Sequence, residues 1–219
     1  LYVGSAAPER MAGLVRKLFA EEDRAPLPLP AQSGLRLSKA ADLSERMELT
    51  QGKLCMGFVT PVTAKDPGFP AMQLLCAVFG GDVTSKLFRN IREKQSLCYS
   101  IGAGYYSAKG IVLVSAGIDF DKEAHVREEV LRQLDACRRG EITEEELTSA
   151  RASLISALES VPDSPGALES YYSSMVLGGS GLDPQAHRKA LEAVTPEDLT
   201  RAADSLTLHS TCFLKGVSQ

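Results

Sequence analysis

Hydrophobic and polar positions change their period along the chain, and these changes separate strand-like from helix-like stretches. Over residues 45–60, ERMELTQGKLCMGFVT partly alternates between apolar and polar residues, which indicates paired strand segments. PGFPAMQLLCAVFGG is apolar throughout, has proline near its start and ends in two glycines, so it predicts a short buried helix. A second helix is expected over residues 83–93.

The middle of the chain contains the strongest hairpin signal. SLCYSIGAGYYSA and GIVLVSAGID are both β-rich, and Lys109 and Gly110 separate them. Helical patterns follow in DKEAHVREEVLRQLDACRRG, in ITEEELTSARASLISALES with a Thr143–Glu146 capping box, in PDSPGALESYYSSMVLGG, and in TPEDLTRAADSL with Thr195 as its cap. TLHSTCFLKG predicts a final strand.

The N-terminal stretch has its own pattern. LYVG predicts a short buried strand, and a helix is expected from about Pro8, because apolar residues follow at helical spacing. APLPLPAQSG contains three prolines and predicts an extended connector. Because the chain starts at Leu1 inside an apolar run, we expect an upstream part of the protein.

The order of these elements predicts the fold class. Strands dominate the first half and helices are grouped later, which favours α+β. We therefore expect two layers, with several helices packed on one face of a largely antiparallel sheet.

Charge, hydropathy and cysteine usage narrow the functional classes. The net charge of -4 and pI near 5.5 give no basic field for nucleic acid. No apolar run approaches the roughly 20 residues of a membrane span, so no membrane partner is expected. The five cysteines are scattered and form no C-x-x-C pair, which predicts buried thiols in a reducing, cytoplasmic setting.

The usual catalytic motifs are absent from the sequence. HVREE, which begins at His125, is close to the H-x-x-E-H of inverted zinc peptidases, but Glu129 stands where the second histidine belongs. A surface histidine in a charged helix is the preferred interpretation, and we reject a zinc site in this chain. There is no G-x-S-x-G elbow and no dinucleotide fingerprint, and Cys98 is read as a packed thiol.

Arg92 and Tyr99 remain, seven positions apart across a predicted helix end and strand start. Each alone is ordinary, since arginine suits a helix C-terminus and tyrosine suits a strand. Together they belong to LFRNIREKQSLCYSIGAGYYSAKG. This stretch resembles the C-terminal half-domain of the pitrilysin/insulinase/mitochondrial-processing family of zinc peptidases, which are of the inverzincin type, and the resemblance is to a bacterial member. The residues that carry the resemblance are Gly80, Gly81, Ser85, Leu87, Phe88, Arg92, Glu93, Lys94, Leu97 and Tyr99.

The resemblance implies a substrate-binding role. In this family two similar halves close around a chamber, the first half holds zinc and the general base, and the second lends an arginine and a tyrosine. Arg92 and Tyr99 would then hold peptide and stabilise the oxyanion. No metal is expected in this chain, which alone would be inactive, and zinc would lie in a missing N-terminal half or in a partner.

The resemblance also implies the domain organisation and the partners. Residues 1–24 would be a strand-helix unit and the tail of a preceding half, 25–43 a connector, and 44–219 a peptidase C-terminal-like domain. The expected partners are a peptide substrate and an N-terminal half or homologous peptidase subunit, which leaves a homodimer or a heterodimer open. The alternative is an inactive structural or interaction subunit of the same family.

Overall fold

A computed structural model of the chain describes residues 1–19 and 39–217. Its centre is a five-stranded sheet in the order β1-β5-β2-β4-β3. The strands are β1 (Ala41–Met47), β2 (Gly52–Val59), β3 (Ser100–Tyr106), β4 (Ile111–Ile118) and β5 (Thr207–Gly216). Only the β1–β5 pair is parallel, so the sheet is mostly antiparallel, as predicted.

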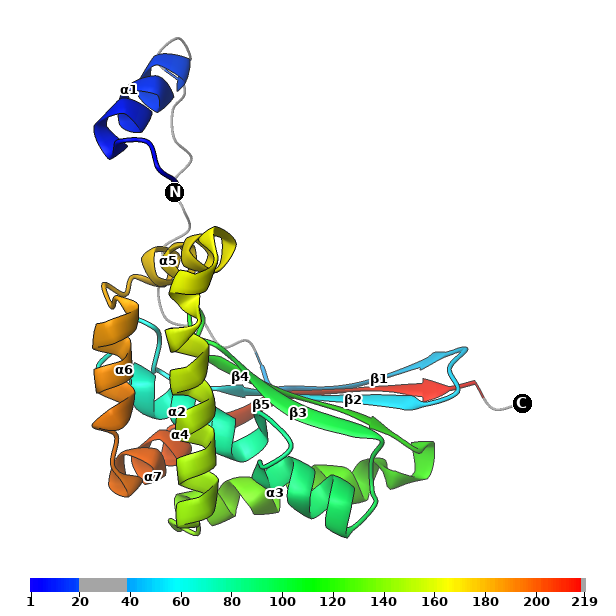
Figure 1. Cartoon of the computed structure of the whole chain (residues 1–219). Coiled ribbons are helices and arrows are strands. Elements are labelled where there is room, and N and C mark those ends of the chain that lie inside the picture. Colours follow the sequence, from blue (N-terminus) through cyan, green and yellow to red (C-terminus); the bar gives the residue numbers. More distant parts are fainter. Residues whose placement is uncertain (20–38, 218–219) are drawn as a thin grey trace.

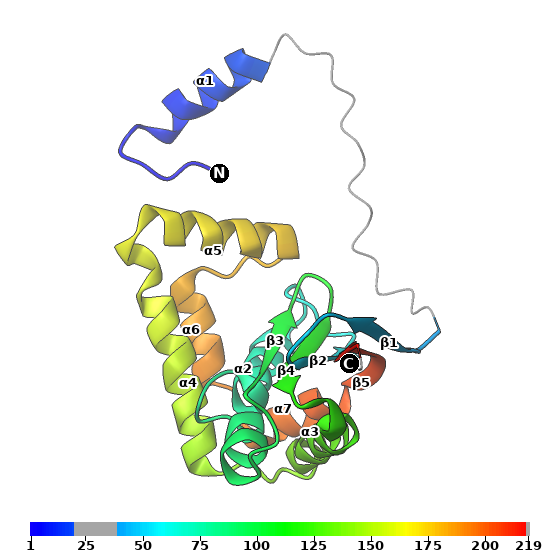
Figure 2. The same cartoon turned by 90° about the vertical axis from the view of Figure 1, so that its right-hand side faces the viewer.

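Helices cover one face of this sheet, which confirms the predicted α+β fold (Figures 1 and 2). The longer helices are α1 (Pro8–Phe19), α2 (Phe69–Gly80), α3 (Glu123–Arg138), α4 (Glu144–Glu159), α5 (Pro165–Gly178), α6 (Pro184–Glu192) and α7 (Pro196–Asp204). Short helical segments are η1 (Phe88–Lys94), a π-helix, and the 3-10 turns η2 (Phe120–Lys122) and η3 (Val161–Asp163). In the described residues no helix is long and apolar enough to cross a bilayer.

The core lies between the sheet and α2. Leu54, Met56 and Phe58 alternate along β2 and are buried on the side that faces the helices. α2 packs against β3 as well as α4 and α7, which explains why its sequence is apolar apart from Gln73. The other side of the sheet, which we call the open face, carries the intervening β2 residues Lys53 and Cys55.

Local signals placed several elements correctly. The hairpin of β3 and β4 forms, and Gly110 takes the left-handed backbone (φ 64°) that its turn requires. Its carbonyl accepts from the Thr60 amide at 2.9 Å. Thr143 and Thr195 each cap their helix within a capping box, as their sequences predict.

The first residues differ from the prediction. LYVG is not a strand in this chain, and Leu1 is 71% exposed. A strand is stable only beside a hydrogen-bonding neighbour, and none of the described residues pairs with this segment. The predicted helix does form as α1, yet none of its residues is buried.

Strand pairing also differs from the expectation. The segment 45–60 does contain parts of two strands, but β1 and β2 do not pair with each other, because β5 lies between them. β1 starts at Ala41, inside the stretch assigned to the connector, and residues 25–38 of that connector lie outside the described residues. The division into 1–24, 25–43 and 44–219 stays a prediction.

Two helices depart from the sequence expectation. The expected helix over 83–93 is represented by η1, which begins at Phe88 and ends at Lys94. α6 was missed, although its start is marked by Asp183, whose side chain accepts from the Ala186 amide at 2.7 Å. Aspartate followed by proline is a helix-start signal that could have found it.

Candidate functional site

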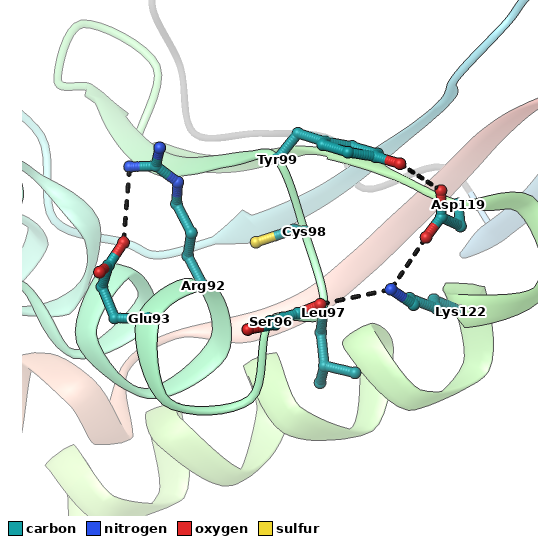
Figure 3. Close-up of a pocket in the computed structure, with 8 residues that line it drawn as sticks. All are labelled: Arg92, Glu93, Ser96, Leu97, Cys98, Tyr99, Asp119 and Lys122. Atoms are coloured by element: carbon teal, nitrogen blue, oxygen red, sulfur yellow. Dashed lines mark hydrogen bonds and ion pairs between the residues drawn. The ribbon is translucent and has the colours of Figure 1, made fainter.

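A cavity of about 400 Å³ opens where η1 ends and β3 begins (Figure 3). Its lining residues come from η1, from the turn that follows, and from the end of β4 with η2. They are Arg92, Glu93, Ser96, Leu97, Cys98, Tyr99, Asp119 and Lys122. The predicted pair Arg92 and Tyr99 therefore faces one cavity.

A tight turn holds these two residues on either side of the cavity. The Ser96 and Leu97 amides donate to the carbonyls of Arg92 (3.1 Å) and Ile91 (3.0 Å), which ends the π-helix. Ser96 has φ of 50°, a left-handed conformation that is costly for a residue with a side chain. Leu97 and Ile91 are buried and anchor the turn in the core.

The Arg92 side chain is open to solvent, with 39% of its surface exposed. Its guanidinium carbon lies 4.5 Å from the centre of the Phe88 ring, which orients the group. The nearest carboxylate is that of Glu93, at 3.8 Å from Nη1. An exposed ion pair of this length is weak, so the guanidinium can exchange it for a carbonyl or carboxylate ligand.

Tyr99 is 59% exposed, and its hydroxyl is held by Asp119. The phenol donates to Asp119 Oδ1 at 2.6 Å, and Lys122 Nζ lies 2.8 Å from Asp119 Oδ2. Lys122 also donates to the Ser96 carbonyl at 3.3 Å, so the network is tied to the strained turn. We call Tyr99, Asp119 and Lys122 the hydroxyl latch.

The three side chains of the hydroxyl latch shift one another's pKa values. The hydrogen bond to Asp119 and the charge of that carboxylate raise the pKa of Tyr99, since the neutral phenol is the donor. Hydrogen bonds from Lys122 and then Tyr99 lower the pKa of Asp119. The hydrogen bond to Asp119 raises the pKa of Lys122. At neutral pH the latch therefore holds a phenol, a carboxylate and an ammonium.

The tips of the predicted pair do not converge. In Figure 3 the Tyr99 ring points towards Asp119, away from the Arg92 guanidinium on the opposite side of the cavity. Neither group is sealed by neighbouring atoms. For Tyr99 to donate to a bound peptide, its hydroxyl has to exchange Asp119 for the new acceptor.

Sequence reasoning missed Asp119 and Lys122. The register of the β3–β4 hairpin places these residues at the cavity. Ser100 lies opposite Gly117, and the Tyr99 amide donates to the Gly117 carbonyl at 2.8 Å. Asp119 then follows directly after β4, beside Tyr99. The two predicted runs of the hairpin already contained Tyr99 and Asp119, and an assigned register would have placed the two side by side.

The residues of HVREE do not build a metal site. His125 is exposed on α3, whereas Glu129 is buried and accepts hydrogen bonds from Arg132 (2.6 Å) and Gln133 (2.7 Å). Within residues 1–19 and 39–217, no group of three or more His, Cys, Asp or Glu side chains is placed to hold a metal ion. The part of the chain that the structure describes therefore offers no donor set that fits zinc.

Cys98 lines the cavity but is not an activated nucleophile. Burial raises the pKa of its thiol to about 11, so the thiolate is scarce at neutral pH. The arrangement is suited to binding, because a guanidinium, an ammonium and a phenol line the same cavity.

The sequence of the chain matches a known protein family and several curated proteins. The family model described as "Peptidase M16 inactive domain" matches residues 1–154. The "Probable inactive metalloprotease YmfF" of Bacillus subtilis is 26% identical over 214 residues, which cover 98% of this chain and 50% of that protein. The chain spans about half the length of this relative, and less of the other curated relatives it matches.

Solved structures repeat the fold. A conserved protein from Enterococcus faecalis V583 superposes with a TM-score of 0.83 at 26% identity, covering 98% of this chain and 51% of that one. The peptidase M16 inactive domain from Pseudomonas fluorescens superposes with a TM-score of 0.80 at 16% identity, covering 98% and 52%. The second likeness concerns the fold alone.

Proposed function

The chain belongs to the peptidase M16 family, as a domain of the inactive type, and from this premise we propose that it is the substrate-binding, non-catalytic half of a zinc metallopeptidase. The observation that carries the proposal is the shared cavity: Arg92 and Tyr99, predicted as a pair from sequence, both line it, with Tyr99 exposed and Arg92 partly exposed. Zinc and the general base are assigned to an N-terminal half or a partner subunit.

Each side chain has a distinct role in this proposal. The planar guanidinium of Arg92 presents several donors that can hold a peptide carbonyl or a terminal carboxylate. The Tyr99 phenol donates to the oxygen of the scissile carbonyl, where negative charge develops as water attacks. Asp119 keeps that hydroxyl in place until peptide provides the new acceptor.

The partner in this proposal is a second half of the same family. The lengths of two curated relatives support it, because each of these proteins is about twice as long as this chain. The apolar residues Leu14, Val15 and Leu18 on α1 are exposed and provide a surface that such a half could cover. The compartment is proposed to be the cytoplasm, as the thiols suggest.

Turnover by the complete protein or complex tests the proposal. Tyr99→Phe removes only the hydroxyl, so kcat/KM for peptide cleavage should fall about 100-fold, as expected for a lost oxyanion donor. Tyr106→Phe is the matched control, since Tyr106 is an exposed tyrosine at the end of β3 that does not line the cavity. Equal activity of the two variants would refute the role of Tyr99.

A second candidate is an inactive interaction subunit of the same family. Two observations favour it: the matching relative is named as probably inactive, and the Tyr99 hydroxyl is already bonded to Asp119. Purification of the complete protein with its partners separates the candidates. A stable assembly that neither binds nor cleaves peptides would support the second candidate and contradict the first.

A further inference from the structure

Two cysteines lie directly opposite each other in the middle of the sheet. In the antiparallel pairing of β2 with β5, Cys55 is the partner of Cys212. Their neighbours Leu54 and Phe213 are buried in the core, so both cysteines point to the open face. Both are partly exposed, and small reagents can therefore reach them.

The register also fixes the separation of the two backbones. Along a strand, the backbone N–H and C=O groups of successive residues point to opposite neighbouring strands. Because the Thr60 amide donates to the Gly110 carbonyl, every second residue of β2, counted back from Thr60, points these groups towards β4. Cys55 belongs to the other set, and its backbone groups point towards β5. It forms a hydrogen-bonded pair with Cys212, for which the Cα atoms are about 5.5 Å apart. That separation lies within the range of disulfides.

A bond between the two sulfurs would require side-chain rotation. The Cys55 sulfur lies 4.0 Å from Ser115 Oγ, on the β4 side, away from β5. Cβ atoms of directly opposite residues are about 4.5–5.5 Å apart, whereas a disulfide brings them to roughly 3.5–4.5 Å. The strands therefore have to approach slightly, and a bond formed under such strain is readily reduced.

We propose that Cys55 and Cys212 form a reversible disulfide site that joins the central strands β2 and β5. The oxidant is a low-molecular-weight disulfide of the glutathione class. One cysteine thiolate attacks that reagent, releases one reduced thiol and forms a mixed disulfide. The second cysteine thiolate attacks the protein sulfur, closes the Cys55–Cys212 bond and releases a second thiol. Two electrons pass to the reagent, and the two protein thiol protons end on the released thiols.

The other cysteines lack these features. Cys76 and Cys137 are buried, and burial raises the pKa of each thiol to about 12. Cys98 borders the cavity and has no cysteine opposite it in the sheet, since it precedes the start of β3. The inference is independent of the proposed peptide-binding function, because neither Cys55 nor Cys212 lines that cavity.

Mass spectrometry of the purified chain tests the site. The folded, reduced protein is incubated with increasing ratios of oxidised to reduced glutathione, alkylated and digested with trypsin. Cleavage after lysine and arginine gives the peptides 54–65 and 202–215, each with a single cysteine. We expect these two peptides to become linked as the ratio rises, and to separate again on addition of dithiothreitol.

Variants define the pair. Cys55→Ser and Cys212→Ser should each abolish the linked peptides, while Cys98→Ser, a matched cysteine outside the pair, should leave them unchanged. The proposal is overturned if wild-type protein accumulates glutathione on Cys55 or Cys212 without any linked peptide. It is equally overturned if both cysteines remain open to alkylation at every ratio.

Discussion

The hydroxyl latch is the least expected feature at the scale of single residues. Tyr99 and Arg92 were visible in the sequence because their spacing resembles a family pattern, whereas Asp119 stands twenty positions later and carries no motif. Its importance comes from the 2.6 Å hydrogen bond, which occupies the hydroxyl that peptide would use. The latch makes the availability of Tyr99 depend on a carboxylate.

Asp119→Asn tests this dependence. The amide removes the negative charge beside the phenol, so the pKa of Tyr99 should fall towards its ordinary value, because the carboxylate is what raises it. Ultraviolet titration of the tyrosines measures this, and subtraction of the same titration in Tyr99→Phe isolates the signal of Tyr99. An unchanged Tyr99 titration in Asp119→Asn would show that the latch does not form in solution.

At the scale of elements, the turn between η1 and β3 fixes the cavity. Ser96 has a positive φ, so Ser96→Gly should remove steric strain and change the free energy of unfolding in the stabilising direction, by up to about 1 kcal/mol. Denaturant titration measures the change. Ser100→Gly is the control, since Ser100 begins β3 and glycine there should destabilise by about 0.5–1 kcal/mol. Destabilisation of both variants alike would argue against strain at Ser96.

The cap of α4 offers a second prediction for an element. Thr143 accepts from the Glu146 amide at 3.2 Å, and the Glu146 side chain accepts from the Thr143 amide at 2.9 Å. Thr143→Ala should therefore lower the free energy of unfolding by about 1 kcal/mol. Thr148→Ala, at an exposed position inside the same helix, should change it by only a few tenths. Equal effects in the same denaturation experiment would contradict the assigned cap.

These elements also show what sequence reasoning can reach. The α4 cap and the β3–β4 hairpin were predicted because their signals are local: a threonine three positions before a glutamate, and two β-rich runs joined by a glycine turn. The insertion of β5 between β1 and β2 was not predicted, because pairing over such a distance depends on packing across the whole sheet. Asp119 was missed for the same reason, since only the register places it beside Tyr99.

At the scale of the whole molecule, the chain is a domain of the M16 inactive type with a cavity lined by Arg92 and Tyr99, and its described residues contain no metal-binding set. The sheet and its helices hold η1 and β3 in fixed relation, so Arg92 and Tyr99 stand on opposite sides of the cavity without touching (Figure 3). A peptide would have to bridge them. In this account, the domain contributes contacts to a substrate that another half cleaves.

Equilibrium binding of a labelled peptide substrate to the complete protein or complex, followed by fluorescence anisotropy, tests the central claim most directly. The double variant Arg92→Ala/Tyr99→Phe removes both groups from the cavity. Arg89→Ala/Tyr106→Phe removes one arginine and one hydroxyl nearby that do not line it, Arg89 being paired with Glu145 at 2.6 Å. The account predicts that Kd rises roughly tenfold or more for Arg92→Ala/Tyr99→Phe and stays unchanged for the control variant. Equal affinity of both variants and the wild type would contradict it.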